Sequence, residues 1–214
     1  MKHLINKYKL HLNSRKFLLS VFFAVVLFAI SLAANFYAGL YATERASNSV
    51  TDIVLSNVRA FDVDGLFVYG TIAFWAFVII LFLLRPEKIP FTLKTIALFV
   101  FVRSVFVSLT HIGPYPTQIA IDSNILSAFV FGGDLFFSGH TGLPFLMALI
   151  FWQDVYLRFL FIASSIIFGI VVLLAHLHYS IDVLSAFFIT YTIYHIAEFI
   201  FKKDREVFFS GVKP

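Results

Sequence analysis

Two short stretches of the chain hold residue types that could do chemistry together. The first is GGDLFFSGHT at residues 132–141, and the second is HYSIDV at residues 178–183. His178 and Asp182 are four positions apart, so on a helix they share one face, and His140 lies upstream in the first stretch. A neutral imidazole can act as a nucleophile, a second can protonate a leaving group, and a carboxylate can orient the first. The pattern predicts one site built from His140, His178 and Asp182.

The residues before His140 suit phosphoryl transfer. Ser138 and Gly139 form a turn that leads into an apolar run, so backbone N–H groups at a helix N-terminus can face an anion there. An arginine nearby could hold phosphate oxygens. This assembly favours a covalent phosphohistidine with no metal and no other cofactor. A metal held by the two histidines and Asp182 remains an alternative, which loss of activity in a chelator would favour.

The composition predicts that these residues lie in a membrane protein. The chain is 60% hydrophobic and 13% charged, about half the share of charge in a soluble domain. Its mean hydropathy is +0.92. There is no cysteine, which excludes a disulfide, a thiol nucleophile and a cysteine-bound metal. The net charge of +4 comes from short basic flanks beside apolar runs, which argues against a nucleic-acid partner. Imidazole and carboxylate groups are costly at a membrane, so they indicate function.

Six apolar runs approach the roughly 20 residues that a transmembrane helix needs. They lie at about 17–38, 66–84, 93–110, 141–152, 158–175 and 180–201, and the fourth is short. The first is long and lacks a cleavage pattern, so we expect an anchor and not a removed signal peptide. The predicted fold is all-α with six transmembrane helices. Its parts are a basic cytoplasmic segment 1–16, a catalytic membrane domain 17–201 and a cytoplasmic tail 202–214.

The distribution of lysine and arginine predicts the orientation. With six spans, thirteen of these residues fall on the side that holds both termini, and three fall elsewhere, namely Arg45, Arg59 and Arg103. Cytoplasmic loops carry the excess of Lys and Arg, so both termini are expected in the cytoplasm. The two motifs then meet at the opposite face. We expect the active site on the non-cytoplasmic side, in a bacterial inner membrane because the chain is short with little soluble extension.

The two motifs resemble those of a known family. GGDLFFSGHT and AHLHYSIDV are similar to the C-terminal motifs of the sphingomyelin synthase family, a branch of the type 2 phosphatidic acid phosphatase superfamily. The likeness covers about residues 100–195 and extends to Arg103, Thr110 and Pro114. It implies a membrane enzyme that acts on phospholipids through a histidine nucleophile and needs no cofactor.

The resemblance assigns roles residue by residue. His178 matches the nucleophile that attacks phosphorus, and Asp182 matches the carboxylate that orients it. His140 matches the histidine that handles the proton of the leaving or attacking hydroxyl. The expected phosphate-binding residues are Arg103, Ser138 and Gly139, and the expected supporting residues are Asp134, Thr141 and Tyr179.

The departures from the wider superfamily bear on the substrate. Val171 and Val172 stand where that superfamily has Ser-Arg, and Arg85-Pro86 lacks the lysine that normally precedes it. Those cations grip a phosphomonoester dianion, whereas a phosphodiester carries one charge fewer. The pattern favours a transferase that moves a phospholipid headgroup to a lipid hydroxyl. The alternatives are a lipid phosphatase or phospholipase C-like hydrolase with water as acceptor and, less favoured, a lipid transporter or scramblase.

Overall fold

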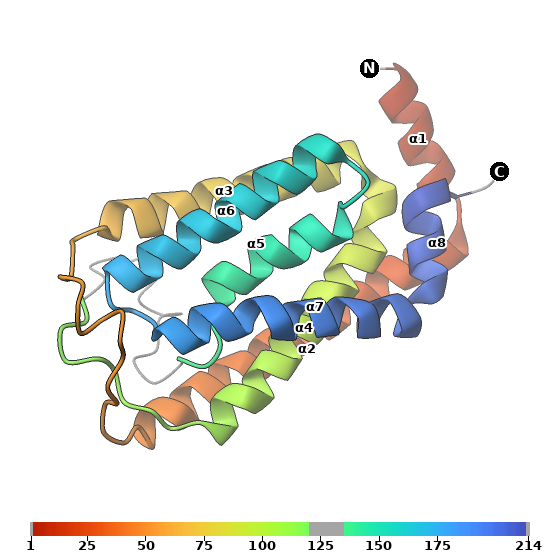
Figure 1. The fold of residues 1–214 in the computed structure, drawn as a ribbon. Helices are drawn as coiled ribbons and strands as arrows, with labels where there is room; N and C mark the ends of the chain where they lie inside the picture. The colour runs from red at the N-terminus through yellow and green to blue at the C-terminus, as the bar shows by residue number, and fades with distance from the viewer. Residues whose placement is uncertain (1, 120–134, 213–214) are drawn as a thin grey trace.

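The computed structural model describes residues 2–119 and 135–212, with the backbone alone for residues 2–6. The regular elements in these ranges are all helical (Figure 1). They are α1 (Lys2–Leu12), α2 (Arg15–Glu44), α3 (Asp64–Leu84), the 3-10 turn η1 (Pro86–Lys88), α4 (Ile89–Leu109), α5 (Gly139–Ile150), α6 (Val155–Leu174), α7 (Ser180–Ile200) and α8 (Lys202–Ser210). The all-α prediction is confirmed for this part of the chain.

Five of the helices are long and apolar enough to cross a membrane, namely α2, α3, α4 together with η1, α6 and α7. These are the helices of a multi-pass integral membrane protein. Helix α5 has only 12 residues and rises about 18 Å, which is less than the roughly 30 Å of a hydrocarbon core. Each of the six predicted runs is therefore a helix, but six full-length spans are not confirmed. The predicted N-terminal segment and tail contain the short helices α1 and α8.

Local sequence signals set several helix ends. Side-chain oxygens of Ser14 and Asp154 accept backbone N–H groups at the first turns of α2 and α6. Helix α3 ends at Leu84, as predicted, because Pro86 has no N–H to donate and cannot continue the helix.

Helix α5 lies at the centre of the bundle, packed against α4, α6 and α7 (Figure 1). Eight of its residues are buried, which agrees with an apolar sequence on almost every side. Gly142 lets α5 approach α4, because a Cβ there would lie only 2.7 Å from Phe99. Helix α2 runs along α4, while α3 packs on α6 through the rings of Phe74, Phe77 and Phe161. This arrangement places the start of α5 near the start of α7.

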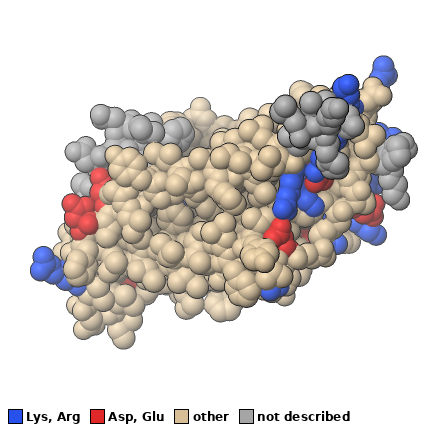
Figure 2. Space-filling view, turned by 90° about the horizontal axis from the view of Figure 1, so that it is seen from above, with Lys and Arg blue, Asp and Glu red and all other residues tan. Residues whose placement is uncertain are grey.

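The molecular surface has an apolar middle and charged ends. Figure 2 shows Lys, Arg, Asp and Glu gathered at the two ends with other residues between them. Helices α1 and α8, and with them both described ends of the chain, lie at one end of the bundle (Figure 1). There the buried Lys94 of α4 pairs with Asp204 of α8 at 2.6 Å and donates to Ser20 of α2 at 2.9 Å. Helix α7 begins at the opposite end.

Candidate active site

A cavity of about 230 Å³ brings the predicted residues together. His140, His178, Arg103 and Gly139 all line it. The remaining lining is mostly apolar and comes from α2 to α6 and the adjoining turns, namely Leu32, Asn35, Phe67, Thr71, Phe74, Trp75, Phe99, Val100, Gln118, Leu135, Leu143, Pro144, Phe168 and Leu177. A polar site with apolar walls is the usual form of a pocket for an amphiphilic ligand.

His178 does not lie on a helix, which corrects the sequence prediction. It belongs to the turn before α7, whose first residue is Ser180. Its Nδ1 nevertheless lies 3.6 Å from Oδ2 of Asp182, and the carboxylate is fully buried. That separation is an ion-pair distance and too long for a hydrogen bond. Asp182 instead accepts the backbone N–H of Tyr179 at 2.9 Å and so caps α7.

His140 is the second residue of α5, and aromatic rings surround it. The imidazole centroid lies 4.4 Å from the ring centroid of Phe67 on α3 and 6.2 Å from that of Phe168 on α6. Ser138 caps the helix with its hydroxyl, which accepts the N–H of Thr141 at 3.3 Å. Because α5 begins at Gly139, its N-terminus opens toward the cavity, as the sequence predicted.

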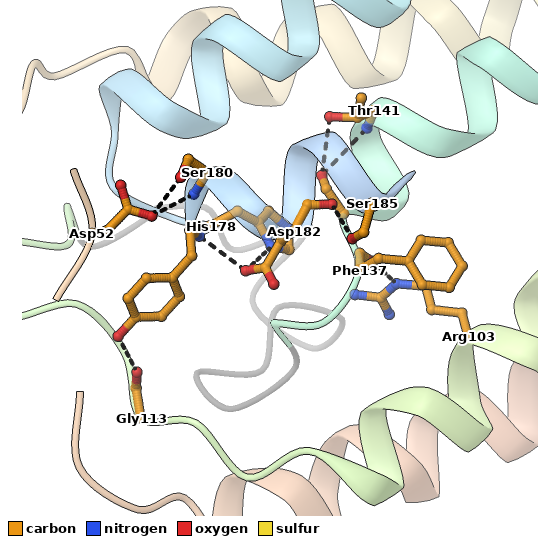
Figure 3. A network of polar contacts seen from close by, with 11 residues as sticks. Asp52, Arg103, Gly113, Phe137, Thr141, His178, Ser180, Asp182 and Ser185 are labelled. Carbon is orange, nitrogen blue, oxygen red and sulfur yellow. Dashed lines mark hydrogen bonds and ion pairs between the residues drawn. The ribbon is translucent and has the colours of Figure 1, made fainter. Parts of the chain in front are cut away.

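A backbone hydrogen bond joins the two motifs directly. The N–H of Ser138 donates to the carbonyl of Asp182 at 3.1 Å. The hydroxyl of Ser185 donates to the same carbonyl at 3.2 Å (Figure 3). The turn before α5 and the first turn of α7 are thus fixed to each other, which keeps His140 and His178 at one site.

Arg103 reaches the cavity from α4 and is held by groups on two other segments. Its Nε donates to the carbonyl of Phe137 at 2.8 Å, and its Nη1 donates to Oδ1 of Asn35 at 3.2 Å. A Cβ at Gly139 would lie 3.4 Å from Nε, so the guanidinium sits against the backbone that starts α5. A planar cation fixed in this way can present N–H groups to phosphate oxygens.

The other predicted residues do not line the cavity or lie outside the described residues. Ser138 and Thr141 are fully buried and bonded to each other, and Tyr179 is 2% exposed. They shape the turns that carry the histidines. Asp134 lies outside the described residues. Among the residues that are described, no three His, Asp or Glu side chains come together as a metal site would require.

A comparison with protein families matches residues 132–199 to the C-terminal region of the PAP2 superfamily. This match supports the predicted resemblance to the PAP2 superfamily and does not distinguish the sphingomyelin synthase-like branch. The matched PAP2 region contains His140, His178 and Asp182, while Arg103 lies before it. No curated protein and no solved structure matches the chain.

Two residues outside the PAP2 match were missed by sequence reasoning. Asn35 of α2 lines the cavity and holds Arg103, and a polar residue inside an apolar run was the available signal. Asp52 lies in the segment between α2 and α3, and its Oδ2 accepts the backbone N–H and the hydroxyl of Ser180 (Figure 3). Burial acts to raise the pKa of Asp52, but hydrogen bonds from Leu55 and Ser180 outweigh it and hold the pKa below its usual value of 3.8. No local pattern in the sequence predicts the contact between Asp52 and Ser180.

His176 precedes His178 by two positions and has a different environment. Its Nδ1 lies 2.6 Å from the hydroxyl of Thr117, and its Nε2 lies 3.2 Å from the carbonyl of Val58. Its φ of +54° is in the left-handed region, which turns the chain between α6 and His178. His176 thus fastens two connecting segments and does not line the cavity.

Proposed function

We propose that the protein is an integral membrane lipid phosphotransferase that cleaves a phospholipid headgroup through a phosphohistidine and passes it to a lipid hydroxyl. PAP2 superfamily members are phosphatases or phosphotransferases, which supports this class of reaction. The observation that carries the proposal is the cavity where His140, His178 and Arg103 meet between apolar helix walls. An apolar wall suits acyl chains, and the three polar side chains suit a phosphate.

In the first step, Nε2 of His178 attacks phosphorus in line with the bond to the diacylglycerol oxygen. Nδ1 is the nitrogen beside Asp182, so the opposite ring nitrogen is the one free to react. The new P–N bond forms as the P–O bond breaks, and His140 in its imidazolium form gives its proton to the departing oxygen. The carboxylate of Asp182, 3.6 Å away, stabilises the positive charge on the phosphorylated ring.

In the second step, neutral His140 takes the proton of the acceptor hydroxyl. The acceptor oxygen attacks phosphorus, the P–N bond breaks, and its electron pair returns to His178. A lipid hydroxyl gives a new phospholipid, and water gives the free phosphorylated headgroup. Arg103 holds the phosphate oxygens through both steps.

The charge of the cavity favours a phosphodiester substrate. Arg103 is the one Lys or Arg among the described residues that line it. Val171 and Val172, where the wider superfamily has Ser-Arg, are buried in an apolar cluster with Phe67 and Leu177. A single fixed cation suits the single negative charge of a phosphodiester better than the dianion of a phosphomonoester.

The site faces the non-cytoplasmic side in this proposal. Helix α7 starts at the bundle end remote from both described chain ends (Figure 1). The excess of Lys and Arg on the side of the two termini supports a cytoplasmic location for that side. The substrate is then a phospholipid of the outer leaflet.

The test uses purified protein in liposomes with a panel of phospholipids, with and without ceramide or diacylglycerol, while lipid products and free phosphate are followed. A new phospholipid that needs an acceptor supports the transferase. His178→Ala should abolish it and His140→Ala should slow it roughly 10²–10⁴-fold. His195→Ala, at the other end of α7, is the matched control and should keep full turnover.

Three outcomes would contradict parts of the proposal. Substantial turnover by His178→Ala would exclude the nucleophile. Free phosphate from phosphatidic acid, with no acceptor, would identify a lipid phosphatase instead. Activity lost in EDTA and restored by a divalent metal would favour the metal alternative.

A further inference from the structure

The segment between α2 and α3 touches the candidate active site through one carboxylate. Asp52 is 8% exposed. Its Oδ1 accepts the backbone N–H groups of Val54 and Leu55 at 2.8 and 3.0 Å, which fixes the carboxylate within its own loop. Its Oδ2 accepts the N–H of Ser180 at 2.7 Å and the hydroxyl of Ser180 at 2.8 Å. One side chain thus joins this loop to the first residue of α7.

Tyr179 makes a second tie at the same place. Its hydroxyl donates to the carbonyl of Gly113 at 2.8 Å and accepts the N–H of Val50 at 3.2 Å. Its ring packs in an apolar cluster with Leu55 and Leu135. The turn from His178 to Ser180 is therefore held by hydrogen bonds to two connecting segments, 45–63 and 110–119.

These contacts matter because helix α7 itself does not fix His178. The residue lies before α7, so no hydrogen bond within that helix sets its backbone. Asp182 caps Tyr179 and lies 3.6 Å from Nδ1 of His178, so it does not hold the ring by a hydrogen bond. The direction of the imidazole then depends on where the turn is held, and the contact of Asp52 with Ser180 lies two residues away (Figure 3).

We propose that Asp52 is a positioning residue that holds the turn carrying His178, so that the nucleophile points at the phosphorus. The inference rests on the proposed function and adds a residue from a part of the chain outside the PAP2 match. Asp52 does not line the cavity, so it acts through Ser180 and not on the substrate. The carboxylate is ionised at neutral pH, which makes both of its hydrogen bonds to Ser180 charge-assisted.

The first test compares Asp52→Asn with Asp62→Asn in the liposome assay. Both variants remove one carboxylate from the same loop, but Asp62 is exposed and its side chain accepts only from Asp64 among its described contacts. Asp52→Asn should lower kcat about 10- to 100-fold, because a reacting group misplaced by about 1 Å loses that much. KM should stay within about twofold, since Asp52 contacts no part of the cavity. Asp62→Asn should keep the kcat of the unmodified chain.

A second pair of variants covers the case in which Asp52→Asn does not fold. Ser180→Ala removes one of the two hydrogen bonds, and Ser180→Thr keeps the hydroxyl. Ser180→Ala should lower kcat about 3- to 10-fold and Ser180→Thr should restore it, whereas a purely structural role would alter the melting temperature and leave kcat unchanged.

A third measurement needs no turnover, so the two proposals can fail separately. Diethyl pyrocarbonate modification, followed by mass spectrometry, reports the accessibility of each imidazole in the folded protein. His178 should react at least threefold faster in Asp52→Asn than in Asp62→Asn, while His140 is unchanged. Unaltered kcat and unaltered His178 reactivity in Asp52→Asn would overturn the positioning role even if His178→Ala is inactive. No turnover on any lipid would overturn the proposed function, and the modification rates would still decide the role of Asp52.

Discussion

Replacing Gly142 by alanine tests whether the close contact between α5 and α4 positions the site. A Cβ at Gly142 would lie 2.7 and 2.8 Å from two ring carbons of Phe99 and 3.0 Å from the hydroxyl of Thr190. Phe99 and Thr190 are both fully buried, so neither side chain has room to retreat. Reaching an ordinary contact near 3.4 Å requires α5 to move away by about 0.7 Å.

The expected cost follows from that displacement. Overpacking costs about 1–3 kcal/mol, and the better helix propensity of alanine returns up to about 1 kcal/mol. The net loss of up to about 2 kcal/mol should lower the melting temperature by up to about 8 °C. Since His140 is on α5 and Arg103 on α4, the same displacement misplaces the two groups relative to each other, and turnover should fall at least tenfold.

Thermal unfolding in detergent and turnover in liposomes measure both effects. Gly65→Ala is the control, because a Cβ there meets only Tyr69 at 3.9 Å, and it should be neutral or slightly stabilising. Phe99→Leu removes the opposing ring carbons, so Gly142→Ala combined with it should lose less than the sum of the two single changes. A Gly142→Ala protein with unchanged melting temperature and turnover would refute this reasoning.

Three further predictions concern charged groups. Arg103→Lys keeps the positive charge but loses the planar guanidinium, so turnover should fall about tenfold or more. Turnover equal to that of the unmodified chain would show that Arg103 does not hold the phosphate. Arg85 donates to Asp154 at 2.9 Å; burial acts to raise the pKa of Asp154, but this bond and the N–H of Leu157 outweigh it and lower the pKa. Because the pKa of Asp154 is lowered in the folded state, the ionised carboxylate stabilises the fold above its ordinary pKa of 3.8, and this stabilisation is lost as the pH falls below that value. The melting temperature of Asp154→Asn should therefore vary less between about pH 5 and 3 than that of the unmodified chain. Lys94→Met leaves Asp204 without its buried partner and should cost about 3 kcal/mol in unfolding experiments, whereas a loss below about 1 kcal/mol would show that the pair is unimportant.

The sequence predicted the helices well because the signal for them is local. A run of about 20 apolar residues and a proline such as Pro86 act on their own stretch of chain, and the structure has a helix at each predicted run. The short run predicted at 141–152 is the 12-residue helix α5, which begins two residues earlier, at Gly139, because Ser138 caps it.

The sequence singled out the residues of the candidate site, but their geometry came only from the structure. His140 and His178 meet in one cavity, as the common face of the two motifs suggested. Spacing alone implied that His178 and Asp182 lie on one helix, but the helix starts after His178, because Asp182 caps it at Tyr179. The contact of Asp52 with Ser180 crosses 128 positions, and nothing local in the sequence encodes it.

The link between α8 and Lys94 has a consequence for the biosynthesis of the protein. Lys94 lies in the third long apolar helix, and its carboxylate partner Asp204 lies after α7 in the chain, so it is made later than the six helices of the bundle. Until residues 202–210 leave the ribosome, α4 must hold an ammonium group without the acid that compensates it. The bundle therefore reaches its final stability only after translation of α8, and a tag or truncation that disturbs α8 should reduce the amount of protein that survives quality control.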